Sequence, residues 1–106
     1  MIYVFDIDGT ICNNTNGKYD TAIPFVERIK KINKLFDEGN NIIFFTARGM
    51  KTFNNNLEKV YEKYYNFTSE QLKNWNVKYH QLILGKPSAD FYIDDKGIKD
   101  EDYFRT

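Results

Sequence analysis

The sequence predicts an α/β fold, a Rossmann-like parallel sheet of about four strands with helices on both faces and no inserted cap domain. Two observations support this prediction: four short apolar runs punctuate the chain, and helical patterns fill most of the intervals between them. Runs without polar alternation are typical of strands covered on both faces, and strands that alternate with helices form parallel sheets through right-handed crossovers. A length of 106 residues favours a single domain spanning residues 1–106.

The predicted strands are the four continuous apolar runs, at residues 2–5, 42–45, 82–84 and 91–93. The first run starts at the second residue, with no basic segment before it and no small-residue cleavage site after it. We therefore interpret it as a strand and not as a signal peptide.

The predicted helices come from apolar stripes at helical spacing. One helix is expected from Ile23 to Phe36, with Pro24 in its first turn and Gly39 just beyond its end. A second stripe covers residues 53–64, and Thr68 with Gln71 resembles a capping box that opens a short third helix toward residue 75. The turn-prone segment 12–19 is expected to be a mobile loop.

Composition narrows the classes of partner. Fifteen basic and fifteen acidic residues balance, so no global field would draw the protein onto nucleic acid or an anionic membrane. No apolar run is long enough to span a bilayer, and the single cysteine, Cys12, cannot form an internal disulfide. These features predict a cytoplasmic protein with neither nucleic acid nor membrane as its partner.

Polar side chains stand at or just beyond the end of each predicted strand. Asp6 and Asp8 follow the first strand, Thr46 the second and Lys86 the third, and the pair Asp94 and Asp95 follows the fourth. The carboxyl ends of parallel strands lie along one edge of a sheet, where open α/β folds bind ligands. We therefore expect these residues to meet in one crevice.

The residue types in that crevice indicate phosphate chemistry. Four neighbouring carboxylates repel one another unless a cation joins them, and oxygen ligands without His or Cys favour Mg²⁺. A lysine and a threonine remain to hold an anion. Asp6 and Asp8 are two residues apart and point the same way in an extended chain, so Asp6 can be a nucleophile with Asp8 near the leaving oxygen. Gly9 permits a sharp turn there.

These motifs resemble the haloacid dehalogenase superfamily of aspartate-nucleophile phosphatases. Asp6-Ile7-Asp8-Gly9-Thr10 is similar to its first motif, and Thr46, the Lys86 of Gly-Lys-Pro and the pair at 94–95 are similar to its second, third and fourth. The resemblance implies a Mg²⁺-dependent phosphatase with Asp6 as nucleophile and Asp8 as proton donor and acceptor. It also implies that Thr46, Ala47 and Lys86 bind the phosphoryl group. The implied metal ligands are Asp6, the backbone carbonyl of Asp8, and Asp94 or Asp95.

Three features stay open at this stage. Arg48 could contact phosphate or substrate, or lie on the surface, and His80 is expected to be structural. The intervals between motifs are too short for a cap domain, so the site should be open, covered by the loop 13–19 or by a neighbouring subunit in a homo-oligomer.

The segments Phe-Thr-Ala-Arg-Gly-Met and Leu-Gly-Lys-Pro-Ser-Ala-Asp-Phe-Tyr-Ile-Asp-Asp-Lys resemble a narrower group, small phosphatases of capsule and surface-polysaccharide synthesis. That resemblance implies a phosphorylated sugar, polyol or related small alcohol as substrate. The alternatives are a phosphatase for polynucleotide ends or phosphoproteins, a degenerate binding protein, and a phosphoreceiver-like signalling domain. The receiver is disfavoured because its paired acids come first in the chain, whereas here the pair comes last.

Overall fold

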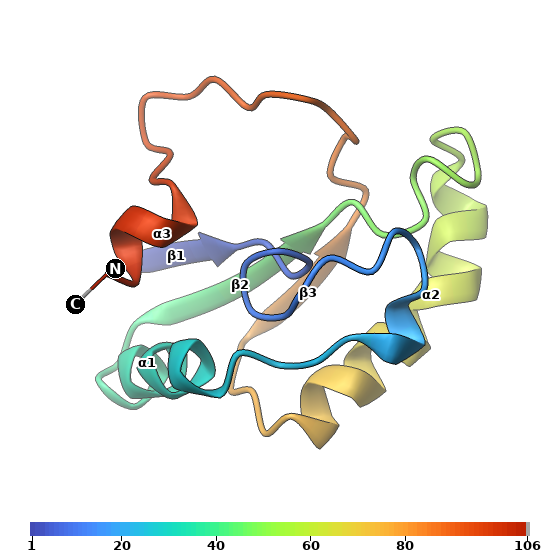
Figure 1. Ribbon diagram of the computed structural model, residues 1–106. Coiled ribbons are helices and arrows are strands. Elements are labelled where there is room, and N and C mark those ends of the chain that lie inside the picture. The colour runs from blue at the N-terminus through green and yellow to red at the C-terminus, as the bar shows by residue number, and fades with distance from the viewer. Residues whose placement is uncertain (106) are drawn as a thin grey trace.

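The computed structural model describes residues 1–105 and contains one parallel sheet. Its strands are β1 (Ile2–Phe5), β2 (Asn41–Thr46) and β3 (Gln81–Leu84), in the spatial order β1-β2-β3 (Figure 1). The register places Phe5 beside Phe44, and Phe44 beside Leu82. The carboxyl ends of the three strands therefore lie side by side.

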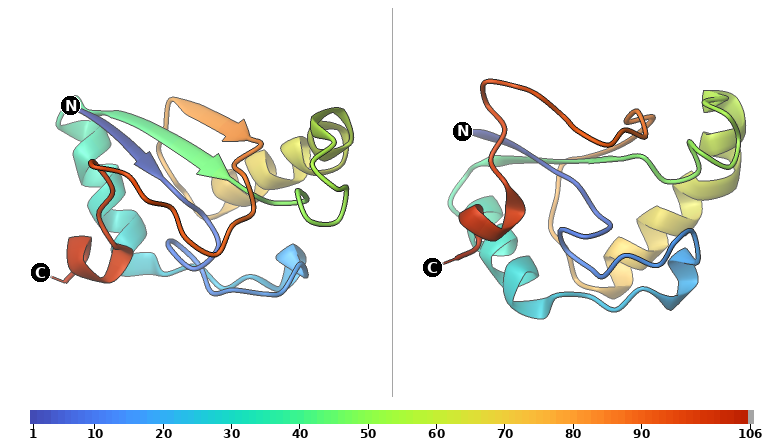
Figure 2. Two further views of the ribbon diagram at one scale, coloured as in Figure 1. Left: turned by 90° about the horizontal axis from the view of Figure 1, so that it is seen from above. Right: turned by 45° about the horizontal axis from the view of Figure 1, so that its top comes forward.

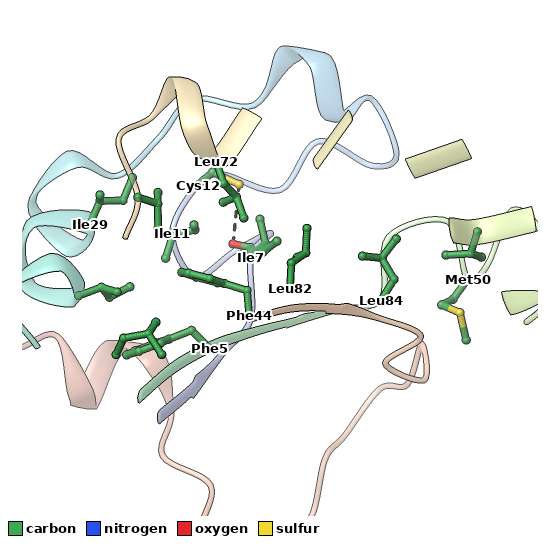
Figure 3. Packing of buried hydrophobic residues seen from close by; sticks show 14 residues of the cluster. Phe5, Ile7, Ile11, Cys12, Ile29, Phe44, Met50, Leu72, Leu82 and Leu84 are labelled. Atoms are coloured by element: carbon green, nitrogen blue, oxygen red, sulfur yellow. Dashed lines mark hydrogen bonds between the residues drawn. The ribbon is translucent and has the colours of Figure 1, made fainter. Parts of the chain in front are cut away.

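Two long helices cover one face of this sheet. They are α1 (Val26–Asp37) and α2 (Leu57–Asn74); the chain also forms a 3-10 turn, η1 (Tyr19–Thr21), and a short C-terminal helix, α3 (Asp100–Tyr103). Figure 3 shows the core side chains between the strands and these helices, all on the same side of the sheet. Within residues 1–105, every helix is too short or too polar to cross a lipid bilayer.

The core consists of alternate residues from each strand and one stripe from each helix. The strands contribute Phe5, Ile42, Phe44, Leu82 and Leu84. The helices and the connecting segments complete the cluster with Ile7, Ile11, Cys12, Ile29, Ile32, Met50, Val60, Leu72 and Val77. The intervening strand residues Ile2, Val4 and Ile83 are exposed on the other face. Only one face of the sheet is therefore covered by helices.

Two predictions about the sheet need correction. The run at 91–93 is not a strand, and Phe91 and Ile93 are 83% and 98% exposed. Helices on both faces were also expected, but α1 and α2 share a face. Both errors have one cause: an apolar run indicates that a segment needs cover and a pairing partner, but it does not show where in the fold that partner lies.

Three helix predictions are also corrected by the structure. The first helix begins at Val26, because Pro24 instead forms an isolated antiparallel bridge with Cys12. The second begins at Leu57, where the side chain of Asn56 accepts a hydrogen bond from the Lys59 N–H at 3.2 Å. The third does not exist separately, since Thr68 and Gln71 lie inside the continuous α2. Gly39 does follow the end of α1, with a φ of +93° that suits glycine.

Candidate functional site

A cleft of about 240 Å³ lies at the carboxyl ends of the strands. Its walls come from the turns after β1, β2 and β3 and from the loop before η1. The lining residues are Asp6, Asp8, Asn14, Thr15, Asn16, Gly17, Tyr19, Thr46, Ala47, Arg48, Lys86 and Tyr92. The structure therefore brings together six of the eight residues that sequence analysis selected, from positions up to 80 residues apart.

Asp6 is the carboxylate that remains open to the cleft. It follows the last residue of β1, and its side chain is 33% exposed, with Lys86 Nζ 3.7 Å from its Oδ1. Burial raises the pKa of Asp6, and the nearby Lys86 ammonium opposes that rise. Asp6 is thus a partly desolvated oxygen nucleophile beside one cation.

Asp8 is held in a bidentate ion pair with Arg48. The Arg48 Nε donates to Asp8 Oδ2 at 2.9 Å, and its terminal nitrogen donates to Asp8 Oδ1 at 3.0 Å. The Arg48 side chain is fully buried and the Asp8 side chain is 19% exposed. A planar guanidinium in this geometry fixes the carboxylate plane, so the direction of the free oxygen lone pairs is set by Arg48.

The Arg48 guanidinium is itself held by α2 and η1. Its Nη1 donates to Gln71 Oε1 at 2.7 Å and to Thr68 Oγ1 at 3.4 Å, and its central carbon lies 4.7 Å from the Tyr19 ring centre. Gln71 in turn donates to the backbone oxygen of Tyr19 at 2.8 Å. The surface position considered for Arg48 is therefore wrong: the residue is a buried support for Asp8 that also lines the cleft.

The turn after β2 supplies a hydroxyl and backbone groups. Thr46 is the last residue of β2, and its Oγ1 accepts from the Arg48 N–H at 3.2 Å. The Gly49 N–H donates to the Tyr19 hydroxyl at 3.0 Å. Gly49 has a φ of +78°, and a Cβ there would lie 2.5 Å from the Tyr64 ring, so only glycine fits this turn.

The loop over the cleft is the segment predicted to act as a flap. Gly9 lies in the turn after β1 and has a φ of +85°, and its N–H donates to the Cys12 carbonyl at 2.8 Å. The chain then carries Asn14, Thr15 and Asn16 along the cleft wall. Thr15 Oγ1 is buried without a hydrogen-bond partner, which leaves one hydroxyl of the wall unsatisfied.

The structure does not bring Asp94 and Asp95 to this cleft. Both are exposed, and neither lines the cavity. Their predicted place depended on a fourth strand at residues 91–93, which this chain does not form. Asp94 instead accepts from the Lys96 N–H at 3.1 Å.

The donors of one chain do not complete a magnesium site. Within residues 1–105, no group of three or more His, Cys, Asp or Glu side chains is close enough to share an ion. Both carboxylate oxygens of Asp8 accept hydrogen bonds from Arg48. Among the residues that line the cleft, this leaves Asp6 as the one carboxylate available to a cation. Of the metal ligands expected at Asp6, the Asp8 backbone carbonyl, Asp94 and Asp95, the chain therefore keeps the last two away from the cleft.

Two other residues have structural contacts. His80 stacks on Phe36 and accepts from the Ile42 N–H at 3.1 Å through Nδ1, which confirms the structural role expected for it. Cys12 is buried beneath Asp8, and burial raises the pKa of its thiol to about 12. A thiol with that pKa is a poor nucleophile at neutral pH.

Sequence reasoning missed Gln71 and Tyr92 as parts of the site, and it did not foresee that Tyr19 of the predicted flap contacts Arg48. Tyr19 and Gln71 contact Arg48, and the Tyr92 ring lies 4.3 Å from Lys86 Nζ. The interval between Thr68 and Gln71, read as a capping box, is also the interval that places two side chains on one helix face. That second interpretation was the signal available for Gln71.

Comparison with known proteins supports the fold and assigns no activity. No family model and no curated protein matches the chain. The crystal structure of an MCSG target from Vibrio cholerae is similar over 99% of this chain and 88% of its own, with 26% sequence identity and a TM-score of 0.92. The small α/β architecture therefore recurs in an experimentally determined protein.

Proposed function

We propose that the protein is a Mg²⁺-dependent phosphatase of the haloacid dehalogenase type, with Asp6 as its nucleophile. The observation that supports this proposal is the meeting of Asp6, Asp8, Thr46, Arg48 and Lys86 around one cleft. A carboxylate, an ammonium group and a hydroxyl at the same strand ends suit attack on a phosphoryl group.

The reaction follows from these groups. An Asp6 carboxylate oxygen attacks phosphorus, and the phosphorus–oxygen bond to the alcohol breaks. The departing oxygen takes its proton from Asp8, which enters this step as the carboxylic acid after taking that proton from solvent. Water then attacks the aspartyl-phosphate and returns a proton to Asp8, releasing inorganic phosphate and the original Asp6 carboxylate. Thr46, the Ala47 backbone and Lys86 hold the phosphoryl oxygens through the two steps.

Charge balance supports a divalent cation as cofactor. With Asp8 protonated for the first step, Lys86 and Arg48 carry two positive charges, whereas Asp6 and a phosphomonoester dianion carry three negative ones. The side chains of the cleft therefore leave one negative charge beside Asp6 unbalanced. Mg²⁺ is the proposed cofactor, and when bound it would neutralise phosphoryl oxygens.

We propose that the substrate is a small phosphorylated polyhydroxy alcohol, such as a sugar or polyol of capsule or surface-polysaccharide synthesis, and the cleft walls offer polar groups for its hydroxyls. Asn14 and Asn16 offer amides, and Thr15 offers an unsatisfied hydroxyl, all beside the phosphate groups. Polar groups of this kind discriminate substrates by the hydroxyls that they pair. A panel of phosphorylated sugars, polyols, nucleotides and phosphopeptides tests this class.

The first experiment is hydrolysis of an aryl phosphate with and without Mg²⁺. The wild-type protein should release phosphate only with the metal, and Asp6→Asn should abolish release. Asp37→Asn is the control, because Asp37 pairs with Lys78 on the surface, away from the cleft. Full activity in Asp6→Asn would disprove the nucleophile assignment.

A further inference from the structure

The segment 86–99, called here the arm, stands away from the body of the chain. It leaves the end of β3, crosses the side of the sheet opposite α1 and α2, and returns at α3 (Figures 1 and 2). Its apolar side chains are exposed to solvent: Phe91, Ile93 and Ile98 are 83%, 98% and 67% exposed. No residue of the arm belongs to the core or packs against it.

Both ends of the arm are fixed, and its middle is free. At one end the Lys86 N–H donates to the Thr46 carbonyl at 3.1 Å. At the other end Asp100 pairs with Arg28 at 2.7 Å, and the Phe104 ring lies 6.1 Å from that of Phe5. Between these anchors, Tyr92 lines the cleft. Among residues 1–105, the hydrogen bonds and ring contacts of residues 87–98 stay within the arm.

The arm lies within the part of the chain that is similar to another protein. The Vibrio cholerae crystal structure matches 99% of the chain at a TM-score of 0.92, and this span includes the arm. Exposed apolar side chains that gather on one segment indicate a surface that another molecule covers.

The uncovered edge of the sheet is the complementary surface. Among residues 1–105, β1 pairs only with β2, so the backbone groups on its outer edge lack a strand partner. Ile2 and Val4 on the bare face are 69% and 59% exposed. By contrast, the outer edge of β3 is closed by the Tyr61 hydroxyl, which accepts from the Leu84 N–H at 3.0 Å and donates to its carbonyl at 3.3 Å.

We infer that two copies of this chain exchange arms, so that residues 91–93 of each copy pair with β1 of the other. The edge of β1 offers unpaired backbone groups, and an extended segment that joins such an edge gains main-chain hydrogen bonds and apolar cover. The contact is isologous, because each copy gives an arm and receives one. The occupant of the bare edge is therefore a second copy.

The exposed apolar area is sufficient for a stable dimer. Phe91, Tyr92, Ile93 and Ile98 on the arm and Ile2 and Val4 on the edge are each more than half exposed. At roughly 100–200 Å² for each such side chain, the two surfaces offer on the order of 800 Å² per copy, which is the amount that a standard interface buries per partner.

Arm exchange would also complete the candidate site, a consequence that rests on the proposed function. Parallel pairing with Ile93 of the partner subunit beside Phe5 sets Asp94 of the partner subunit level with Asp6. A second carboxylate would then stand next to the one open carboxylate of the cleft, and oxygen ligands from two subunits could share one Mg²⁺. Each subunit would supply the nucleophile of one site and the acidic pair of the other.

The first test is the mass of the protein in solution, measured by sedimentation at micromolar concentration. The wild-type protein should be a dimer, and the double substitution Phe91→Asp with Ile93→Asp should be a folded monomer, because both side chains are exposed in the single chain. Ile23→Asp is the matched control. Ile23 is 66% exposed but belongs to neither the arm nor β1, so this variant should still form the dimer. A monomeric wild-type protein overturns the inference.

The second test identifies which segments meet. Chains with Val4→Cys and chains with Tyr92→Cys are mixed, one carrying a tag, and treated with a short thiol cross-linker. We expect a cross-linked heterodimer from the mixture and none from either chain alone, since the native Cys12 is buried. Failure to form the heterodimer, or cross-linking within a monomer that carries both substitutions, overturns the inference.

The third test joins the dimer to the active site. Asp6→Asn chains and chains with both Asp94→Asn and Asp95→Asn are each expected to be inactive, but mixed dimers contain one complete site. If equal amounts of the two chains mix at random, half of the dimers are mixed, and each of these has one intact site of its two. We therefore expect about one quarter of the wild-type activity. No recovery from an active wild-type protein overturns exchange at the site. If the wild-type protein hydrolyses no ester, the proposed phosphatase fails, while the mass and cross-linking results still decide the arm exchange.

Discussion

Replacing Arg48 by Met tests whether the buried guanidinium holds Asp8 in place. Arg48 is fully buried and makes hydrogen bonds of 2.7–3.0 Å to Asp8 and Gln71, so its loss leaves Asp8 without a counter-charge. Breaking a buried pair costs about 3–5 kcal/mol. Since the Asp8 side chain is 19% exposed and water can reach it, we expect the lower end, about 3 kcal/mol.

Urea unfolding followed by the fluorescence of Trp75, the one tryptophan, measures this loss. A cost of about 3 kcal/mol lowers the midpoint by on the order of 2 M for a domain of this size. The control is Lys78→Met, because Lys78 and Asp37 are 50% and 58% exposed, and a surface pair contributes at most about 1 kcal/mol.

A double-mutant cycle separates the ion pair from the packing of Arg48. Asp8→Asn combined with Arg48→Met should cost less than the two single substitutions together, by about 1–3 kcal/mol. Strict additivity, or a cost of Arg48→Met no larger than that of the Lys78 control, would refute the reasoning.

Two further predictions concern the turns and Asp6. Gly49→Ala should cost about 1–3 kcal/mol more than Gly17→Ala in thermal or urea unfolding, since both glycines have positive φ but only the Cβ at 49 would meet a ring; equal costs would contradict this. Asp6→Asn should raise the free energy of unfolding at pH 7 in a metal chelator. Because the pKa of Asp6 is raised on folding, wild-type stability falls as pH rises through that range, and the advantage of the variant should vanish toward about pH 4. A variant that is less stable than wild type at pH 7 would disprove the desolvation of Asp6.

The sequence predicted the strands and their ends well because their signal is local. The runs ending near Phe5, Phe45 and Leu84 are apolar, and polar residues follow each of them, so both the strands and the crevice at their ends could be anticipated. The order of strands in a small parallel sheet then leaves few arrangements.

The features that were missed depend on contacts between segments that are far apart in the sequence. Arg48 meets Asp8 across 40 residues, and nothing in the local pattern distinguishes a buried arginine from an exposed one. The run at 91–93 is strongly apolar, yet whether it forms a strand depends on a partner edge that its own chain does not present. An apolar run indicates that a segment will be buried or paired, but it does not identify the segment that will cover or pair with it.

The most direct measurement of the central claim is acid quenching during turnover of an aryl phosphate with Mg²⁺, followed by mass spectrometry of the N-terminal peptide. We expect a phosphoryl group on Asp6 that is absent without metal and absent in Asp6→Asn. It should be more abundant in Asp8→Asn, because hydrolysis of the intermediate needs the Asp8 carboxylate. Turnover without any phosphoryl-enzyme in both wild type and Asp8→Asn, or a phosphoryl group on another residue, would contradict it.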